Sequence, residues 1–130
     1  MRSVRSGTLI FKEETYAVLG AAMAVYNHLR HGFLEAVYQE AFELELADRQ
    51  IPFKAQHELR IRYKGQLLKK TYLADLLVFE KIIVEIKAIP RITSREEAQV
   101  LNYIRAAGLP LGLVINFGCE NGLEWKRKVS

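Results

Sequence analysis

Hydrophobic residues in the first third of the chain recur at the spacing of α-helices. In residues 12–30 and again in residues 33–49, they fall three or four positions apart and define one apolar face. His31 and Gly32 separate the two segments, and glycine best tolerates the left-handed backbone found at helix ends. The pattern therefore predicts two consecutive helices joined by a short turn.

The spacing changes to a period of two after Pro52. Residues 56–63 alternate between apolar and polar side chains, which predicts a strand with one solvated face. Lys64 and Gly65 mark a turn. Residues 67–79 and 82–88 are apolar on both faces, a pattern typical of strands that are covered on both sides.

One more helix and one more strand are predicted toward the end of the chain. Ser94 and Glu97 have the spacing of a capping box at the start of a helix over residues 94–107. Residues 111–117 predict a fourth strand, which can return parallel to strand 82–88 through a right-handed crossover. We therefore expect an α/β fold with a mixed four-stranded sheet.

Composition limits the classes of protein that fit this pattern. The 130 residues, half of them hydrophobic, suffice for a single domain over residues 1–130. The net charge of +4 permits an anionic partner without requiring one. Basic residues gather at Arg2, Arg5 and 126–128, where we expect solvated, frayed termini.

Cysteine content and hydropathy bear on the compartment. The single cysteine, Cys119, excludes a disulfide within the chain and favours a reducing cytoplasm. No apolar run has the length of a signal peptide or a membrane span, so we expect no membrane association.

Charged residues inside the apolar strands are the main anomaly of the sequence. Asp75 lies within segment 67–79, and Glu85 and Lys87 lie on one face of segment 82–88. A buried carboxylate needs a partner or a metal, and Mg²⁺ prefers oxygen ligands. The lysine could then orient a water molecule or offset charge on a phosphate. A structural ion pair between Lys87 and either acid fits the spacing equally well.

A shared metal site depends on the length of the connection between the two strands. With a two-residue connection, 80–81, Glu85 would lie on the sheet face opposite Asp75. With a three-residue connection, 80–82, Asp75 lies opposite Lys87, and Glu85 lies diagonal to Asp75 on the same face. We therefore predict an odd-length connection or an equivalent bulge.

Several short motifs follow one another in a fixed order along the chain. They are Gly-x-x-Glu-x-x-Tyr (Gly32, Glu35, Tyr38), then Asp75, the triplet Glu85-Ile86-Lys87, Gln99 and the segment 111–118. This order, which covers about residues 15–117, resembles the GxxExxY protein family of the PD-(D/E)XK nuclease superfamily. The resemblance implies a restriction-endonuclease-like αβββαβ core preceded by an extra N-terminal helix.

The resemblance also implies a role for each matching residue. The implied metal ligands are three acids and one backbone carbonyl, those of Glu35, Asp75, Glu85 and Ile86. Lys87 matches the lysine of the triplet and would position water or the scissile phosphate. Gln99 and Tyr103, which share one helix face, resemble the Gln-x-x-x-Tyr motif of RecB-like nucleases. The implied catalytic set is Glu35, Asp75, Glu85, Lys87, Gln99 and Tyr103.

Three functional hypotheses follow from these residues. The first is a Mg²⁺-dependent nuclease, with Mn²⁺ as a substitute, whose partner is DNA or RNA. The second is a non-catalytic module that keeps the nuclease fold and binds nucleic acid or protein. The third is a structural or oligomeric protein whose buried charges only pair with one another. The sequence leaves substrate polarity and homo-oligomer formation open.

Overall fold

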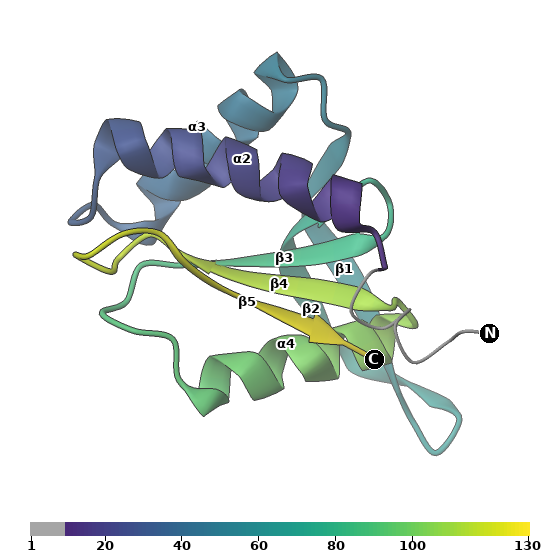
Figure 1. The fold of residues 1–130 in the computed structure, drawn as a ribbon. Helices are drawn as coiled ribbons and strands as arrows, with labels where there is room; N and C mark the ends of the chain where they lie inside the picture. The colour runs from purple at the N-terminus through teal and green to yellow at the C-terminus, as the bar shows by residue number, and fades with distance from the viewer. Residues whose placement is uncertain (1–9) are drawn as a thin grey trace.

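The structure, a computed structural model, describes residues 10–130, so Arg2 and Arg5 lie outside the described residues. Its elements follow in the order α2 (Lys12–Leu29), α3 (Glu35–Asp48), β1 (Phe53–Tyr63), β2 (Gln66–Val78), β3 (Ile82–Lys87), α4 (Ser94–Ala107), β4 (Leu111–Asn116) and β5 (Glu124–Val129) (Figure 1). None of these helices is long and apolar enough to cross a membrane.

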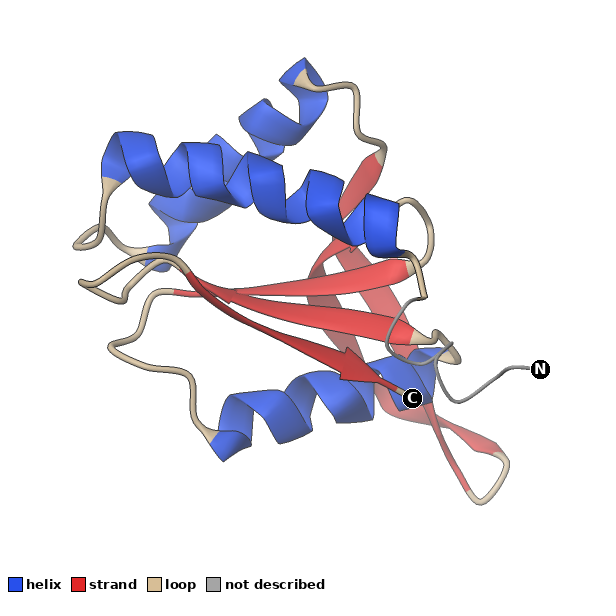
Figure 2. Cartoon of the chain, in the orientation of Figure 1, coloured by secondary structure: helices blue, strands red, loops and turns tan. Residues whose placement is uncertain are grey.

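The strands form one mixed sheet between two layers of helices. Their order is β1-β2-β3-β4-β5, in which β3 and β4 are parallel and the other neighbours are antiparallel. Helices α2 and α3 cover one face and α4 covers the other (Figure 2). Each face buries its own apolar cluster, which includes Phe42 and Val84 on the α2–α3 side and Ile83 and Val100 on the α4 side. The predicted α/β fold is therefore confirmed.

The sheet has a fifth strand that the sequence did not reveal. Strand β5 pairs with β4 along its full length, with Trp125 opposite Ile115 and Lys128 opposite Gly112. The basic segment 126–128 is thus part of the sheet edge, and the prediction that it frays was wrong. Its charged side chains obscure the apolar alternation of a strand, but they are typical of sheet edges, where they discourage pairing with other chains.

Two local predictions also needed correction. The capping box of α4 is formed by Thr93 and Glu96, because Thr93 is the extended residue before the helix and Ser94 is already helical. Strand β2 is covered on both sides only in its C-terminal half, whereas residues 66–70 are exposed. The apolar residues there, among them Leu67 and Leu68, lie outside the core.

Tyr38 fixes the turn between α2 and α3. Its hydroxyl donates to the carbonyl oxygen of Arg30 and accepts from the backbone N–H of Phe33 at 3.2 Å. Its buried ring stacks on Phe117 with 4.9 Å between the ring centroids. The tyrosine therefore has a structural role, and it holds the first turn of α3, which begins with Glu35, beside the ends of β3 and β4.

Gly118 follows β4 and lies against the backbone that leaves β3. A Cβ atom at this position would lie 2.4–2.5 Å from backbone atoms of Ala88 and Ile89. Because backbone cannot turn aside, we expect Gly118→Ala to lower the free energy of unfolding by about 2–3 kcal/mol in urea denaturation. In the control variant Gly20→Ala, the added carbon approaches only the tip of Arg49 at 3.4 Å and favours the helix. Equal stability of the two variants would contradict the expected clash.

Candidate functional site

The connection between β2 and β3 has an odd number of residues, as predicted. Val78 pairs with Ile82, so the connection comprises the three residues 79–81. It begins one residue earlier than expected, because Phe79 and Glu80 adopt left-handed backbone conformations with φ of 56° and 58°. This geometry removes Phe79 from the strand and shifts the register of the pair.

Strands β2 and β3 separate just before the candidate acids. Continued by one residue, their register places Asp75 opposite Glu85, so the predicted position opposite Lys87 was wrong. Side chains replace the ladder hydrogen bonds here. The N–H of Asp75 donates to Glu85 Oε2 at 3.0 Å, and the N–H of Ile86 donates to Asp75 Oδ2 at 2.7 Å. We call Asp75, Glu85 and Ile86 the strand fork.

Glu85 is a buried carboxylate, with 2% of its surface exposed. Besides the bond at Oε2, its Oε1 accepts a hydrogen bond from the hydroxyl of Tyr72 at 2.5 Å. Burial, with a further contribution from the negative charge of Asp75, raises the pKa of Glu85 to about 7. An ionised Glu85 is therefore costly at this place unless positive charge comes near it.

The other two acids experience the same kind of environment. Burial raises the pKa of Asp75, against the opposing effects of the Ile86 N–H and of Lys87. Desolvation and then the charge of Asp75 raise the pKa of Glu35, although Glu35 lies at the exposed start of α3. Gln39, one turn further along α3, donates to the carbonyl oxygen of Asp75 at 3.2 Å and fixes the helix against the fork.

Helix α4 contributes its Gln-x-x-x-Tyr pair to the same place. Lys87 Nζ donates to Gln99 Oε1 at 3.2 Å, and Tyr103 stacks on Tyr72 with 3.7 Å between the ring centroids. Among the described residues, Lys87 forms no ion pair with either acid of the strand fork. The third hypothesis, a structural protein whose buried charges only pair with one another, requires such an ion pair, and this geometry does not provide it.

Comparison with known proteins identifies the family. The sequence model of the PD-(D/E)XK nuclease superfamily matches residues 12–128. The chain belongs to this superfamily. A solved structure described as "Crystal structure of SSO0001" resembles the superfamily domain in fold, with a TM-score of 0.60 and 16% identity over 74% of this chain. The match covers 50% of that chain, so our chain spans about half its length. No curated protein matches the sequence significantly.

The superfamily predicted from the motif order is thus confirmed, while the narrower assignment to the GxxExxY family stays a prediction. The five-stranded sheet and the additional N-terminal helix are consistent with the restriction-endonuclease-like fold that the motifs implied.

The acids of this superfamily domain suit a divalent cation by their chemistry. Within residues 10–130, no three His, Cys, Asp or Glu side chains are grouped so that they hold a metal ion. Both oxygens of Glu85 already accept hydrogen bonds. Carboxylate oxygens are nevertheless the ligands that Mg²⁺ prefers, and all three acids have raised pKa values. The three carboxylates therefore fit a hard cation by their chemistry, provided that Glu85 gives up one of its hydrogen bonds to bind the cation.

Sequence reasoning missed two residues that build the site. Tyr72 gave no signal beyond an aromatic residue in a strand, yet its hydroxyl bonds Glu85. Asn116 is fully buried, and its side chain bonds the backbone of Ile89 at 2.9 and 2.8 Å and Glu124 at 3.0 Å. These bonds fix the loop that follows β3. A polar residue in the apolar run 111–117 was the available signal.

The hydroxyl of Tyr72 stabilises the ionised form of Glu85. In the metal-free protein, we therefore expect Tyr72→Phe to raise the pKa of Glu85 further above its ordinary value, as measured by NMR titration of the side-chain carboxyl. Tyr16→Phe is the control, since Tyr16 is 69% exposed on α2. An unchanged or lower pKa in Tyr72→Phe would contradict the role of this hydrogen bond.

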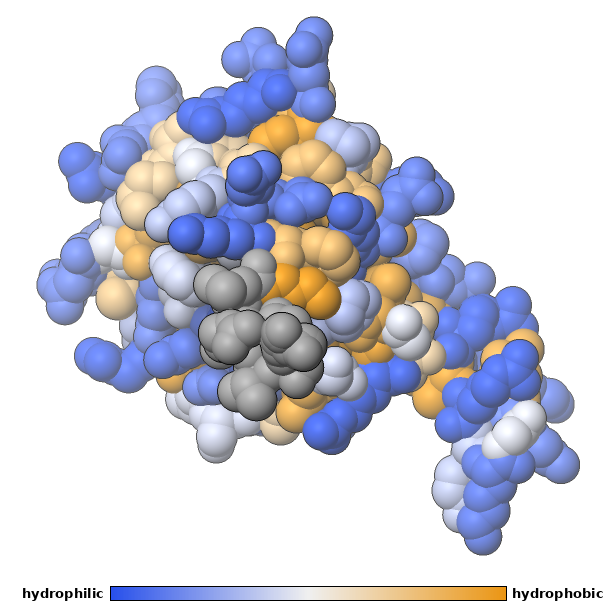
Figure 3. Space-filling model, turned by 45° about the vertical axis from the view of Figure 1, so that its right-hand side comes forward, coloured by the Kyte–Doolittle hydropathy of each residue, from blue (hydrophilic) through white to orange (hydrophobic). Residues whose placement is uncertain are grey.

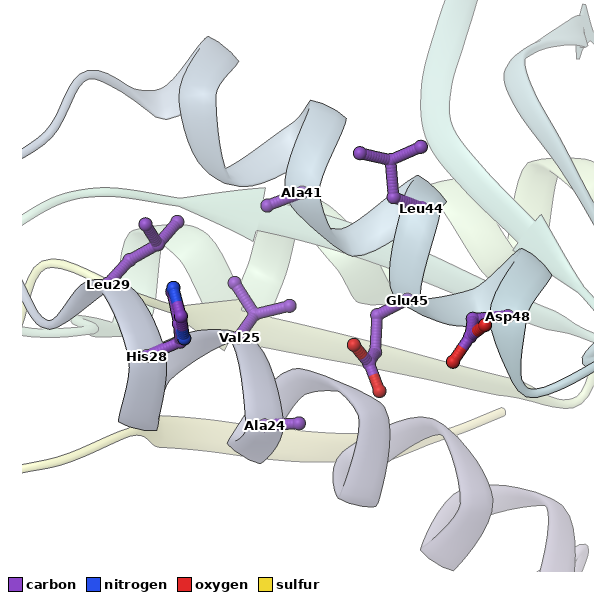
Figure 4. A pocket seen from close by; sticks show the side chains of 8 residues that line it. All are labelled: Ala24, Val25, His28, Leu29, Ala41, Leu44, Glu45 and Asp48. Atoms are coloured by element: carbon purple, nitrogen blue, oxygen red, sulfur yellow. The ribbon is translucent and has the colours of Figure 1, made fainter.

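A hollow of about 700 Å³ lies between α2 and α3, away from these residues (Figure 4). Its lining is mostly apolar, with polar groups from His28, Glu45 and Asp48. Glu45 is already paired with Arg49 at 2.7 Å. No residue of the candidate site lines the hollow, so we assign it no part in the chemistry.

Proposed function

We propose that this superfamily domain is a metal-dependent nuclease that hydrolyses phosphodiester bonds in DNA or RNA, with Mg²⁺ or Mn²⁺ as its cofactor. The observation that carries the proposal is the pair of acids at the strand fork, Asp75 and Glu85, which also interact electrostatically with Glu35 and Lys87. Burial raises the pKa values of these acids, and a divalent cation beside them would favour the ionised carboxylates.

Three acids would hold the metal, with the backbone carbonyl of Ile86 as a further ligand. Glu35, at the start of α3, interacts electrostatically with Asp75, while Asp75 and Glu85 come from the two strands of the fork. When bound, a divalent cation lowers the pKa of a coordinated water and offsets charge on a phosphate oxygen. The protein's own contribution is to hold Asp75 and Glu85 through backbone N–H groups, and Glu85 would give up one hydrogen bond when the metal binds.

Lys87 would position the attacking water or the scissile phosphate with its ammonium group. Gln99 acts through Lys87, whose Nζ it holds at 3.2 Å, and it is therefore a positioning residue. Tyr103 is also a positioning residue, because its ring stacks on Tyr72, whose hydroxyl bonds Glu85. Helix α4 would thus orient the site and also offer polar groups to the nucleic acid.

The test is hydrolysis of single- and double-stranded DNA and RNA with Mg²⁺, Mn²⁺ or EDTA. We expect cleavage only with metal, and a loss of about 100-fold or more in Asp75→Asn, since metal-supplied charge stabilisation is worth several kcal/mol. Asp48→Asn, at the exposed end of α3, is the control. Binding without cleavage under any condition would overturn the proposal and favour the non-catalytic module. Cleavage that survives in Asp75→Asn would exclude this site.

A further inference from the structure

The hairpin formed by β1 and β2 extends beyond the body of the domain. Strand β2 pairs with β3 only through residues 76–78, while it pairs with β1 from its first residue, Gln66, with one shift in register between Arg60 and Arg62. Every residue from 62 to 70 is exposed. Figure 3 shows this segment projecting from the rest of the surface, and we call residues 60–71 the hairpin arm.

The hairpin arm concentrates the positive charge of the chain. It contains no acid and five basic residues, Arg60, Arg62, Lys64, Lys69 and Lys70. Its charge of +5 exceeds the net charge of +4 of the whole chain, so the remainder is slightly acidic. Lys69 and Lys70 belong to β2, where the register shifts and residues 68–70 lie opposite only Ile61 of β1. The arm is therefore positive along both of its strands and also at its tip, where Lys64 lies in the turn.

These charges are not neutralised within the described part of the protein. Arg60, Lys69 and Lys70 make no hydrogen bond or ion pair there. Arg62 bonds only the carbonyl oxygen of Gly65 in its own turn, at 3.3 Å, and Lys64 lies over the neighbouring Tyr63 ring. Five cations on a narrow ribbon, none with an acidic partner among the described residues, fit a polyanion that can surround the ribbon.

We propose that the hairpin arm binds in the major groove of double-stranded DNA, with its basic side chains on the phosphates of both strands. The major groove of B-form DNA, about 12 Å wide, admits a two-stranded β-ribbon. The major groove of double-stranded RNA is too deep and narrow. A ribbon with basic residues on both of its strands matches phosphates on both sides of a groove better than it matches a flat anionic membrane.

The arm lies within reach of the candidate site along one strand. Lys70 is five residues from Asp75, or about 17 Å at roughly 3.3 Å per residue of strand. This corresponds to about five base pairs, so one duplex can contact the arm and the strand fork together. The inference rests on the proposed function, because it names duplex DNA as the substrate of that site.

The experiment compares two triple variants of equal net charge, by fluorescence anisotropy with a labelled DNA duplex of two helical turns, in EDTA and over a series of salt concentrations. The arm variant is Arg60→Gln, Lys69→Gln and Lys70→Gln. The control variant is Lys12→Gln, Lys54→Gln and Lys126→Gln, all exposed and outside the arm. We expect the arm variant to lose at least about tenfold in affinity, and its log–log salt slope to shrink by about 2–3. We expect the control variant to bind like the unaltered protein.

Several outcomes would overturn the inference. They are an equal loss in both variants, stronger binding to double-stranded RNA, or an arm-dependent affinity for anionic phosphatidylserine vesicles that exceeds the affinity for DNA. Because binding is measured without metal, its result is separate from that of the cleavage assay. Metal-dependent cleavage without arm-dependent binding would refute only the role of the hairpin arm. Arm-dependent binding without cleavage would refute only the proposed nuclease activity.

Discussion

Replacement of Lys87 by methionine is expected to lower the rate of metal-dependent hydrolysis by about 100- to 1,000-fold, the usual effect of losing one positioned donor in an active site. The free energy of unfolding should fall modestly at neutral pH, because the Lys87 ammonium donates one hydrogen bond, to Gln99, and its charge favours the ionised forms of the three acids. Single-turnover kinetics at saturating Mg²⁺ measures the rate, and urea denaturation measures the stability.

Binding of Mg²⁺ separates a catalytic role of Lys87 from a structural one. The ammonium lowers the pKa values of all three acids, so its charge also opposes a cation at the same place. Lys87→Met should therefore bind Mg²⁺ at least as tightly as the unaltered protein in calorimetry. Lys54→Met, on an exposed position of β1, is the control for loss of a lysine. Cleavage by Lys87→Met within threefold of that control would refute the assigned role.

The second large effect concerns stability and pH. In EDTA, the free energy of unfolding should rise by about 3 kcal/mol at most as the pH falls from 8 to 5. The pKa of Glu85 is about 7 in the folded protein, against an ordinary value of 4.5. Between these values the folded state binds a proton that the unfolded state does not bind. Stability is therefore gained as the pH falls through 7 and is lost again as it rises.

Two variants test this assignment of the pH dependence. Glu85→Gln removes the titrating group, so its stability should depend much less on pH over the same range. Glu58→Gln, which removes an exposed carboxyl on β1, should keep the full dependence. Saturating Mg²⁺ should also reduce the dependence, because a bound cation favours the ionised carboxylate. An equally steep dependence in Glu85→Gln would show that other groups cause it.

The sequence predicted the fold well wherever burial leaves a periodic pattern. The start and end of α4 agree with the structure, and α2 differs by one residue at its end. Strand β5 escaped detection because an edge strand needs no apolar face, and its charges resemble those of a solvated terminus. The N-terminal half of β2 was predicted to be buried for the opposite reason, since Leu67 and Leu68 are apolar but exposed.

The acids of the site stood out because a charged residue in a buried strand is costly. This reasoning pointed to Asp75 and Glu85, but it could not supply the register, which depends on the left-handed backbone of Phe79. It also could not reveal Tyr72, because a strand tyrosine has the same sequence signature whether its hydroxyl meets solvent or a carboxylate. Such partners follow from the divergence of β2 and β3, a tertiary feature that local spacing does not encode.

The divergence of these strands has a consequence for hydrogen–deuterium exchange. In a continuous ladder, the amide hydrogens of Asp75 and Ile86 would bond backbone carbonyls, and their protection would report on opening of the sheet. At the strand fork they bond the carboxylates of Glu85 and Asp75 instead. Their exchange rates therefore follow the ionisation and side-chain motion of the site itself, and these two amides act as built-in probes of its state.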